Sequence, residues 1–458
     1  MIGERLAPLD LAFWRLESPA HPMHLGALAF FAPGDGTRDG TDDGEGTGTG
    51  GTAREMLALL RGRTGAVPRL AERVRDVLLP VGAAAWTRDP RFDIRRQVRH
   101  LPLRTAGPPG GFPAAAVRAA AGLMARPLDR EHPPWEAHLL TGDPHGSFAV
   151  LVKVHHALAD GMGAVALGAA LLDGAGPRTA PPGRLPDRPP PGPATVLDAA
   201  RDRVTVLGRA IGVGTAVLRA GRLGPSGLPA LTAAPSGTRR VATAVLDLED
   251  VRRVRKAAGG TANDVLLAVV AGALRRWAHE RGEPPGAPGP RALVPVSRYR
   301  PGDPAGPGNS LSGYLLELPV GLDDPRARLA AVRTAMDRNR AAGPLRGAGA
   351  VALIADGLPP LVHRLGTPLA GGAARMLFDL LVTTVPLPRR ALTLGGRPLV
   401  ALHPLAPLAR GQSLSVAMTP YEGQVYVGLL ADGAAVPDLE RLSWSLGEEL
   451  LELLELSL

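Results

Sequence analysis

An apolar run from Ser147 to Val154 is followed by two adjacent histidines and then by a segment of small apolar residues, Met162 to Leu172. The run predicts a strand, and the small-residue segment predicts a buried helix. Successive side chains of a strand point to opposite faces, so only one of His155 and His156 can face a reaction channel. We expect His156 to face it and His155 to be a buried, hydrogen-bonded support. This geometry disfavours a metal site built from both.

Asp160 lies four positions after His156 and immediately before Gly161. Asp-Gly predicts a turn, in which a carboxylate can hold local backbone or an arginine without meeting a substrate. We therefore assign His156, at the end of the strand, the catalytic role of a general base. Asp160 receives a structural role beside it.

Downstream, hydrophobic periodicity predicts a capped helix and a hairpin. Thr261 is a good N-cap, and Asp264 three residues later completes something close to a capping box in front of an apolar stripe. Asn263 then has two interpretations, a plain position in the first helical turn or a direct contribution to the site. Leu414 to Met418 and Val425 to Leu429 alternate with a period of two on either side of a turn, which predicts a hairpin.

Two segments lack the apolar positions that a packed core requires. Gly34 to Gly51 predicts a flexible surface loop. It contains a formal match to the dinucleotide fingerprint, Gly46 to Gly51, without the preceding strand and βαβ context that such a site needs. Pro177 to Pro193 predicts a semi-rigid linker. We place an N-terminal domain at 1–180, a linker with a crossover helix at 181–239, and a C-terminal domain, opening on a strand from Arg240 to Leu246, at 240–458.

Two further segments raise the question of membrane contact. Thr195 to Leu223 has a basic amphipathic pattern, which predicts either a helix on a membrane surface or, more commonly, a crossover helix whose arginines extend over a domain. Val351 to Leu381 is apolar and sparsely charged, and lipid contact there is one of two open interpretations. No run approaches the roughly 20 apolar residues that span a bilayer. The arginines of the first segment that we expect to meet anionic lipid are Arg203, Arg209, Arg219 and Arg222.

Composition narrows the function classes. A chain of 458 residues with 45% hydrophobic residues predicts two or three domains with sizeable cores. The absence of cysteine excludes disulfides, thiolate nucleophiles and cysteine-ligated metals, and the absence of a Gly-x-Ser-x-Gly segment disfavours serine hydrolysis. The net charge of +9 favours an anionic lipid surface over nucleic acid as a partner, because aromatic residues for base stacking make up only 3% of the chain. The N-terminus has no signal-peptide pattern, so we expect a cytoplasmic protein.

The histidine segment has the pattern His-His-x-x-x-Asp-Gly, which resembles the motif of the bacterial wax ester synthase/diacylglycerol acyltransferase family. Other segments similar to that family follow the same order between residues 6 and 445, and the ordered set is far more specific than any one motif. These segments are Pro8-Leu9-Asp10, Pro22 to Gly26, Pro134-Trp135-Glu136 with proline in place of the usual leucine, Asn263 to Ala268, Val294 to Ser297, Gly308-Asn309, Val382 to Pro386 and Gly411-Gln412.

The resemblance implies an α/β fold of two chloramphenicol-acetyltransferase-like domains with a tunnel between them. It implies an acyltransferase that uses acyl-CoA as co-substrate, without cofactor or metal, and acylates diacylglycerol to triacylglycerol or a long-chain alcohol to a wax ester. His156 would deprotonate the hydroxyl, a poor nucleophile at neutral pH, and transfer would be direct. Such an enzyme would lie at the periphery of the inner membrane or on lipid droplets. The oligomeric state stays open.

The resemblance also assigns site residues in the second half. Thr383 and Thr384 end an apolar strand, where a hydroxyl either donates to the thioester oxygen or only favours the strand. Either Arg298 or Arg300 could pair with Asp160. The expected substrate-binding residues are Gly161, Asn263, Thr383, Thr384, Gln412 and Ser415.

Four positions depart from the family pattern and leave the acceptor and the acyl chain open. Thr384, Asp379 and Ser415 stand where asparagine is usual or common, and Leu387 stands where glycine is usual. A specialised acyltransferase that modifies a natural-product hydroxyl or amine is therefore an alternative. A catalytically silent lipid-binding protein is a third reading, which the intact His156 and Asp160 disfavour.

Overall fold

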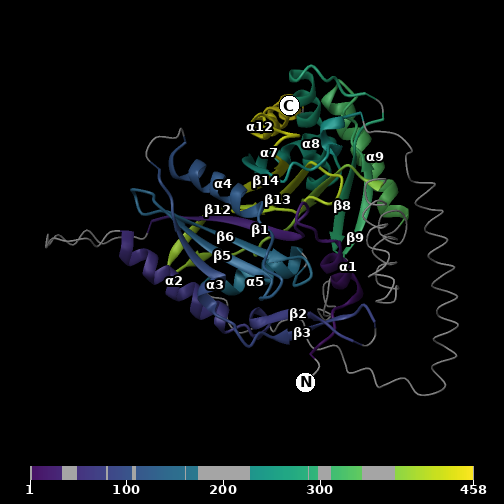
Figure 1. Ribbon diagram of the computed structural model, residues 1–458. Coiled ribbons are helices and arrows are strands. Elements are labelled where there is room, and N and C mark those ends of the chain that lie inside the picture. The colour runs from purple at the N-terminus through teal and green to yellow at the C-terminus, as the bar shows by residue number, and fades with distance from the viewer. Residues whose placement is uncertain are drawn as a thin grey trace, which may run out of the picture.

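The computed structural model describes residues 3–33, 49–78, 81–105, 110–159, 161–173, 227–286, 288–297, 311–342 and 377–456. Within this part of the chain two six-stranded sheets lie next to each other, each covered by helices, and a two-stranded hairpin lies apart from both (Figure 1). This is the mixed α/β architecture with two layered units that the sequence predicts.

The first sheet has the strand order β11-β12-β1-β6-β5-β4. Side chains of β6 alternate between its faces: Val150 packs in a core with α2 and α5, while Leu151 packs in another with α4. The elements from the first half of the chain are α1 (Pro8–Leu16), β1 (His24–Phe31), α2 (Thr49–Gly65), β2 (Glu72–Asp76), β3 (Ala84–Arg88), α3 (Ile94–Gln97), β4 (Val98–Pro102), α4 (Gly111–Met124), β5 (Trp135–Thr141), β6 (Phe148–His155) and α5 (Gly161–Leu171).

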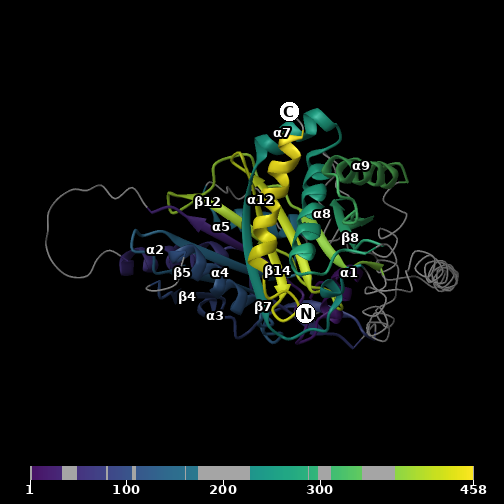
Figure 2. The ribbon, with the colours of Figure 1, turned by 90° about the horizontal axis from the view of Figure 1, so that it is seen from above.

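The second sheet has the order β7-β14-β13-β10-β8-β9, and α8 and α12 lie side by side across it (Figure 2). Its core is built mainly from α8, α12 and the inward faces of the strands. The elements are β7 (Arg239–Asp247), α7 (Leu248–Ala258), α8 (Ala262–Glu280), β8 (Arg291–Ser297), β9 (Leu311–Glu317), α9 (Pro325–Ala342), β10 (Leu380–Thr384), β11 (Thr393–Leu394), β12 (Arg397–Leu405), β13 (Leu414–Tyr421), β14 (Gln424–Asp432) and α12 (Leu439–Glu455).

Three predicted elements of this half are confirmed. β7 covers the expected strand, and α8 begins with the expected capping box between Thr261 and Asp264. β13 and β14 pair antiparallel around a two-residue turn, in which Glu422 and Gly423 have φ values of 44° and 81°. Positive φ at both turn positions matches the twist of the flanking strands.

One crossover links the two halves. β11 and β12 come from the second half of the sequence but belong to the first sheet, where β12 pairs antiparallel with β1. Asp173, just after α5, accepts hydrogen bonds from the Thr393 hydroxyl and from the backbone N–H groups of Gly395 and Gly396. The sequence division, which keeps 240–458 as one domain, did not anticipate this exchange of strands.

Two local expectations need adjustment. The helix expected at residues 162–172 is α5, but most of its described side chains are half-exposed rather than buried, because one face borders a cavity. The last residues of the expected loop Gly34 to Gly51 already belong to α2, which begins at Thr49. Residues 34–48 of that loop, the linker Pro177 to Pro193 and the segment Thr195 to Leu223 lie outside the described residues.

No single helix in the described ranges combines the length and apolarity needed to cross a bilayer. Only α7 and α8 taken together meet those criteria, and they are bent by 102° at their junction.

Candidate active site

The two histidines lie where β6 ends, and two other motif segments hold their backbones. The N–H of His155 donates to the carbonyl of Pro134 at 2.9 Å, and the N–H of His156 donates to the carbonyl of Met23 at 2.8 Å. Segments that are far apart in the sequence are therefore joined at the histidines by ordinary backbone hydrogen bonds.

His155 is fully buried on the face of the sheet opposite Val154. Its Nδ1 accepts a hydrogen bond from the N–H of Ala157 at 2.9 Å, so in the neutral ring Nε2 carries the proton. Nε2 lies 3.5 Å from Oε2 of Glu17, and the Trp14 ring meets the imidazole edge-on at 4.9 Å between centroids. The expected burial and hydrogen bonding of this histidine are confirmed.

The side chain of His156 continues the alternation of the strand and lies on the opposite face from His155. Val150, Val152 and Val154 share that face. Only 8% of its surface is exposed, and the Phe13 ring stacks on the imidazole at 3.9 Å between centroids with an interplanar angle of 19°. Phe13 belongs to α1, a short helix with proline in its first turn. α1 therefore covers both imidazoles, His155 with Trp14 and His156 with Phe13.

Glu17, directly after α1, contacts both the His155 side chain and Met23, the residue that holds the backbone of His156. Its Oε1 accepts the N–H of Met23 at 3.2 Å, and Met23 in turn accepts the N–H of His156. Burial disfavours the charged carboxylate, but the contact with His155, the Met23 N–H and the positive charge of Arg130 outweigh it and hold the pKa of Glu17 below its ordinary value. The side chain is only 4% exposed, so a fixed negative charge lies under the first histidine.

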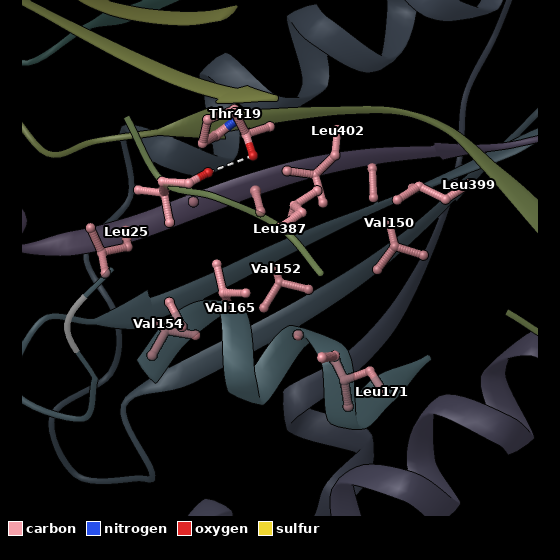
Figure 3. A pocket seen from close by; sticks show the side chains of 18 of the residues that line it. Leu25, Val150, Val152, Val154, Val165, Leu171, Leu387, Leu399, Leu402 and Thr419 are labelled. Carbon is pink, nitrogen blue, oxygen red and sulfur yellow. Dashed lines mark hydrogen bonds between the residues drawn. The ribbon is translucent and has the colours of Figure 1, made fainter. Parts of the chain in front are cut away.

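An apolar cavity begins beside the motif and is bounded by both halves of the chain (Figure 3). Val154 and Gly161, which flank the histidine turn, both line it, and α5 contributes Val165 and Leu171. The second half supplies the opposite wall from β10, β12, β13 and the loop after β10. Residues of that wall include Thr383, Val385, Leu387, Leu402, Ala417 and Thr419.

Among the described residues that line this cavity, the only side-chain polar groups are the hydroxyls of Thr383 and Thr419. Thr419 donates its hydroxyl hydrogen to the carbonyl of Val385 at 2.6 Å, the dashed line of Figure 3. Thr383 makes no side-chain hydrogen bond within the described part of the chain, and it is half-exposed to the cavity. The Thr383 hydroxyl is thus available to donate to a group inside an otherwise apolar space.

Residues 6–266 match the model of the wax ester synthase/diacylglycerol acyltransferase catalytic domain, and residues 307–454 match that of the C-terminal domain of the same family. The chain belongs to this family. A probable diacylglycerol O-acyltransferase of Mycobacterium tuberculosis, tgs2, is 31% identical with 98% of both chains covered, and a second one, tgs1, is 31% identical with 88% of both covered. The resemblance drawn from the motifs is confirmed, and the protein is an acyltransferase.

Solved structures support the same fold. The wax ester synthase/diacylglycerol acyltransferase from Marinobacter aquaeolei VT8 superposes with a TM-score of 0.70 at 25% identity, over 99% of both chains. The first condensation domain of the calcium-dependent antibiotic synthetase superposes with a TM-score of 0.62 at 18% identity, over 100% of this chain and 96% of that one. The second similarity concerns the fold alone.

The structure places the other expected substrate-binding residues of this acyltransferase in two groups. Gly161 and Thr383 line the cavity. Thr384 points to the other side of β10, where its hydroxyl donates to Oδ1 of Asn263 on α8 at 3.0 Å. Asn263 is thus paired with a strand residue, and neither member of this pair lines the cavity.

Gln412 and Ser415 are buried near the start of β13 and are not among the cavity-lining residues. The Ser415 hydroxyl donates to the carbonyl of Ala406 at 2.8 Å, and Oε1 of Gln412 accepts the N–H of Ala409 at 3.1 Å. Both therefore shape the connection that leads from β12 to β13. Asp379, another departure from the family pattern, accepts the N–H of Arg291 at 2.8 Å.

Several expectations fall outside the described residues. They concern Asp160, its candidate partners Arg298 and Arg300, and most of Val351 to Leu381. Within the described ranges no group of three or more His, Cys, Asp or Glu side chains could hold a metal ion.

Phe13 and Glu17 were missed by sequence reasoning. Phe13 lies on an element that the pattern around residues 8–16 did not single out, and an aromatic residue in a short apolar helix is ordinarily a core residue. Glu17 is an acidic residue close to the Pro-Met-His-Leu-Gly segment, and that proximity was the one available signal. Their contacts with the histidines depend on tertiary packing.

We predict that Glu17→Gln lowers kcat by about tenfold with little change in KM, because a small displacement of a catalytic group is costly. Glutamine keeps one acceptor oxygen for these two contacts, so its NH2 must face either Nε2–H of His155 or the N–H of Met23, at a stability cost of about 1–3 kcal/mol. Steady-state kinetics and thermal unfolding measure the two effects. Glu131→Gln, which alters an exposed ion pair with Arg75, is the control. A Glu17→Gln enzyme with wild-type kcat would contradict the positioning role.

Proposed function

We propose that this acyltransferase moves a long-chain acyl group from acyl-CoA to the hydroxyl of diacylglycerol or of a long-chain alcohol, with His156 as general base. The observation that carries the proposal is the cavity: Val154 and Gly161, on the two flanks of the histidine motif, line it, and its described lining is apolar apart from two hydroxyls. An alkyl chain matches such walls, because burying each methylene is favourable by about 0.8 kcal/mol. The names of the relatives and of the family support the same reaction class.

The reaction is a direct transfer. The acceptor oxygen forms a bond to the thioester carbonyl carbon while its proton moves to the imidazole of His156. Collapse of the tetrahedral intermediate breaks the carbon–sulfur bond, and the proton passes from His156 to the departing sulfur of CoA. Phe13 holds the imidazole plane by stacking, and Glu17 with His155 holds the backbone beneath it.

Thr383 is our candidate for stabilising the negative charge on the carbonyl oxygen. Its hydroxyl faces the cavity without another partner in the described residues, and a donor in an apolar site acts strongly on developing charge. Thr419, with its hydroxyl committed to Val385, is not available for the same task. The substrate-binding assignments of Thr384, Asn263, Gln412 and Ser415 stay predictions, and these residues are not among the described residues that line the cavity.

A polar natural-product acceptor is less well supported. It would require several hydrogen-bonding groups on the acceptor side, and the described lining provides the two threonine hydroxyls. We therefore keep lipid alcohols as the proposed acceptors. Since these molecules are insoluble in water, we also propose that the enzyme works at the cytoplasmic surface of the inner membrane or at lipid droplets, where its basic charge favours anionic lipid.

The proposal is tested by an acceptor panel with palmitoyl-CoA, in which ester product is compared with released CoA. Dioleoylglycerol, hexadecanol, a short alcohol, a polar polyol and an aromatic amine would cover the alternatives. Ester formed fastest with the first two supports the proposal. Ester or amide formed fastest with the polyol or the amine would overturn it.

Leu387 offers a prediction about chain selectivity. Its side chain projects into the cavity from the second half, at a position where the family pattern has glycine (Figure 3). Leu387→Ala should raise the kcat/KM ratio of stearoyl- to decanoyl-CoA by about fivefold or more, because a pocket change of a few methylene groups is worth 1–3 kcal/mol. Leu322→Ala, a partly exposed leucine elsewhere, should leave the ratio unchanged. An unchanged ratio in both variants would remove Leu387 from the acyl-chain site.

A further inference from the structure

The hairpin β2–β3 is the only small sheet in the described part of the chain, separate from both large ones. Its strands pair from Glu72–Arg88 to Asp76–Ala84, and the backbone N–H of Val77 extends the ladder to the carbonyl of Ala83. The sequence from residue 77 to residue 86 contains ten residues and no charged side chain. Such a run normally lies inside a protein.

Two described residues of this run, Leu78 and Val81, are exposed instead. Leu78 is 92% exposed, the largest value among the described large hydrophobic side chains, of which the next, Trp444, reaches 63%. Val81, on the other side of the turn, is 50% exposed. Two exposed aliphatic side chains on either side of one turn, with no charged residue between them, leave apolar surface open to an apolar partner.

The base of the hairpin is packed against the histidine turn. Val74, Ala84 and Trp86 form one core cluster with Leu11 and Trp14 of α1 and with Ala157, the residue after His156. Arg15 of α1 donates to Asp76 at 2.7 Å and to the carbonyl of Gly82 at 3.2 Å. The same helix that covers both histidines therefore holds both ends of the hairpin turn.

We propose that the β2–β3 turn inserts Leu78 and Val81 into a lipid surface and thereby holds the histidine turn next to that surface. The proposal rests on the proposed function, since the water-insoluble acceptor must come from lipid. Two apolar side chains are too small a patch for a stable protein interface, which buries about 800 Å² on each partner. They are sufficient for shallow insertion into the boundary between headgroups and acyl chains.

Charge near the turn supports a contact that does not depend on anionic lipid. Asp76 is paired with Arg15, and Arg75 is paired with Glu131 at 2.9 Å, so the described charges at the base of the hairpin are largely compensated. Insertion of this turn should therefore persist at high salt, where attraction between opposite charges is screened within about 3 Å. This separates it from any contribution of the scattered arginines.

The chain contains no cysteine, so one substitution gives a unique labelling site. Leu78→Cys carrying an environment-sensitive NBD dye should gain fluorescence with a blue shift on vesicles of phosphatidylcholine, phosphatidylglycerol and diacylglycerol. Nitroxide on the lipid tails should quench it at low and high salt alike. The control is Leu451→Cys, a 56% exposed leucine on α12. Figure 1 shows α12 and the hairpin at opposite ends of the molecule. A dye at residue 78 that responds no more than one at residue 451 would overturn the proposal.

A second experiment uses Leu78→Asp with Val81→Asp. The bound fraction in vesicle flotation at high salt should fall about tenfold or more, because each replacement removes the favourable transfer of an apolar side chain and adds a charge. Turnover of vesicle-borne diacylglycerol should fall in parallel, while turnover of a water-soluble short alcohol stays at the wild-type value. Leu451→Asp is the matched control.

The outcomes separate this proposal from the proposed function. If the double variant showed wild-type flotation and wild-type turnover on vesicles, the hairpin proposal would be wrong and the proposed acyl transfer would be unaffected. Insertion of the dye at residue 78 in a protein that esterifies no lipid alcohol would uphold the contact and overturn the proposed acceptors. Equal loss of activity toward soluble and vesicle-borne acceptors would indicate damage to the histidine turn and would also count against the hairpin proposal.

Discussion

Replacing His156 with alanine is expected to lower kcat by about 10²- to 10⁴-fold in a protein that still folds, the usual contribution of a positioned general base. The loss of stability should be small, because the residue lies at the end of β6 and its backbone bond to Met23 does not need the imidazole. Ester formation from palmitoyl-CoA and hexadecanol, measured beside thermal unfolding, gives both quantities. The outcome that contradicts the assignment is a folded variant that keeps more than about a tenth of wild-type turnover.

His155→Ala is the matched control for that experiment. It removes a fully buried ring that accepts a bond from Ala157 and faces Glu17, so it should cost more stability than His156→Ala. Truncation also leaves the low-pKa carboxylate of Glu17 buried without one of its stabilising contacts. The two histidines are thus distinguished by the ratio of lost activity to lost stability, which is large for His156 and small for His155.

The opposite placement of the two histidine side chains could be predicted because a strand dictates the alternation. β6 fixes which face of the sheet each histidine side chain meets. The apolar run before the motif is long enough to identify this strand from sequence alone. The capping box at Thr261 and the β13–β14 turn were predictable for the same reason, since each depends on residues within a few positions of one another. Local chemistry was sufficient for all three.

Features that depend on distant packing could not be predicted. The placement of β12 beside β1 joins residues nearly four hundred positions apart, and nothing in either segment specifies the partner. Thr383 and Thr384 show the same difficulty on a smaller scale. Strand alternation requires them to face opposite ways, but only the fold shows that Thr383 faces the cavity and Thr384 faces Asn263.

The covering of the histidines by α1 is the third such feature. Phe13 and Glu17 lie well over a hundred positions before the motif and reach it through packing of α1. The exposure of Leu78 and Val81 likewise became known only from the fold. In this acyltransferase the position of His156 at the end of β6 follows from local pattern, and its surroundings follow from the tertiary fold.

Thr383→Val is expected to lower kcat by about 10²- to 10³-fold, the effect of removing one donor from an oxyanion site, with KM for acyl-CoA nearly unchanged. Valine keeps the branched shape and the strand preference of threonine, so the cavity wall and β10 should survive. The hydroxyl has no other partner in the described part of the chain, and its removal should therefore cost little stability.

Two neighbouring threonines make the experiment decisive. Thr384→Val removes a hydroxyl that donates to Asn263 on the opposite face of β10, and Thr419→Val removes one that donates to the Val385 carbonyl on the cavity wall. Each of these leaves an acceptor without its donor and should cost about 1–3 kcal/mol of unfolding free energy with a smaller effect on kcat. If Thr383→Val lowered kcat no more than these two, the carbonyl oxygen would have to be stabilised by another group, and the Thr383 hydroxyl would be only a strand residue exposed to an apolar space.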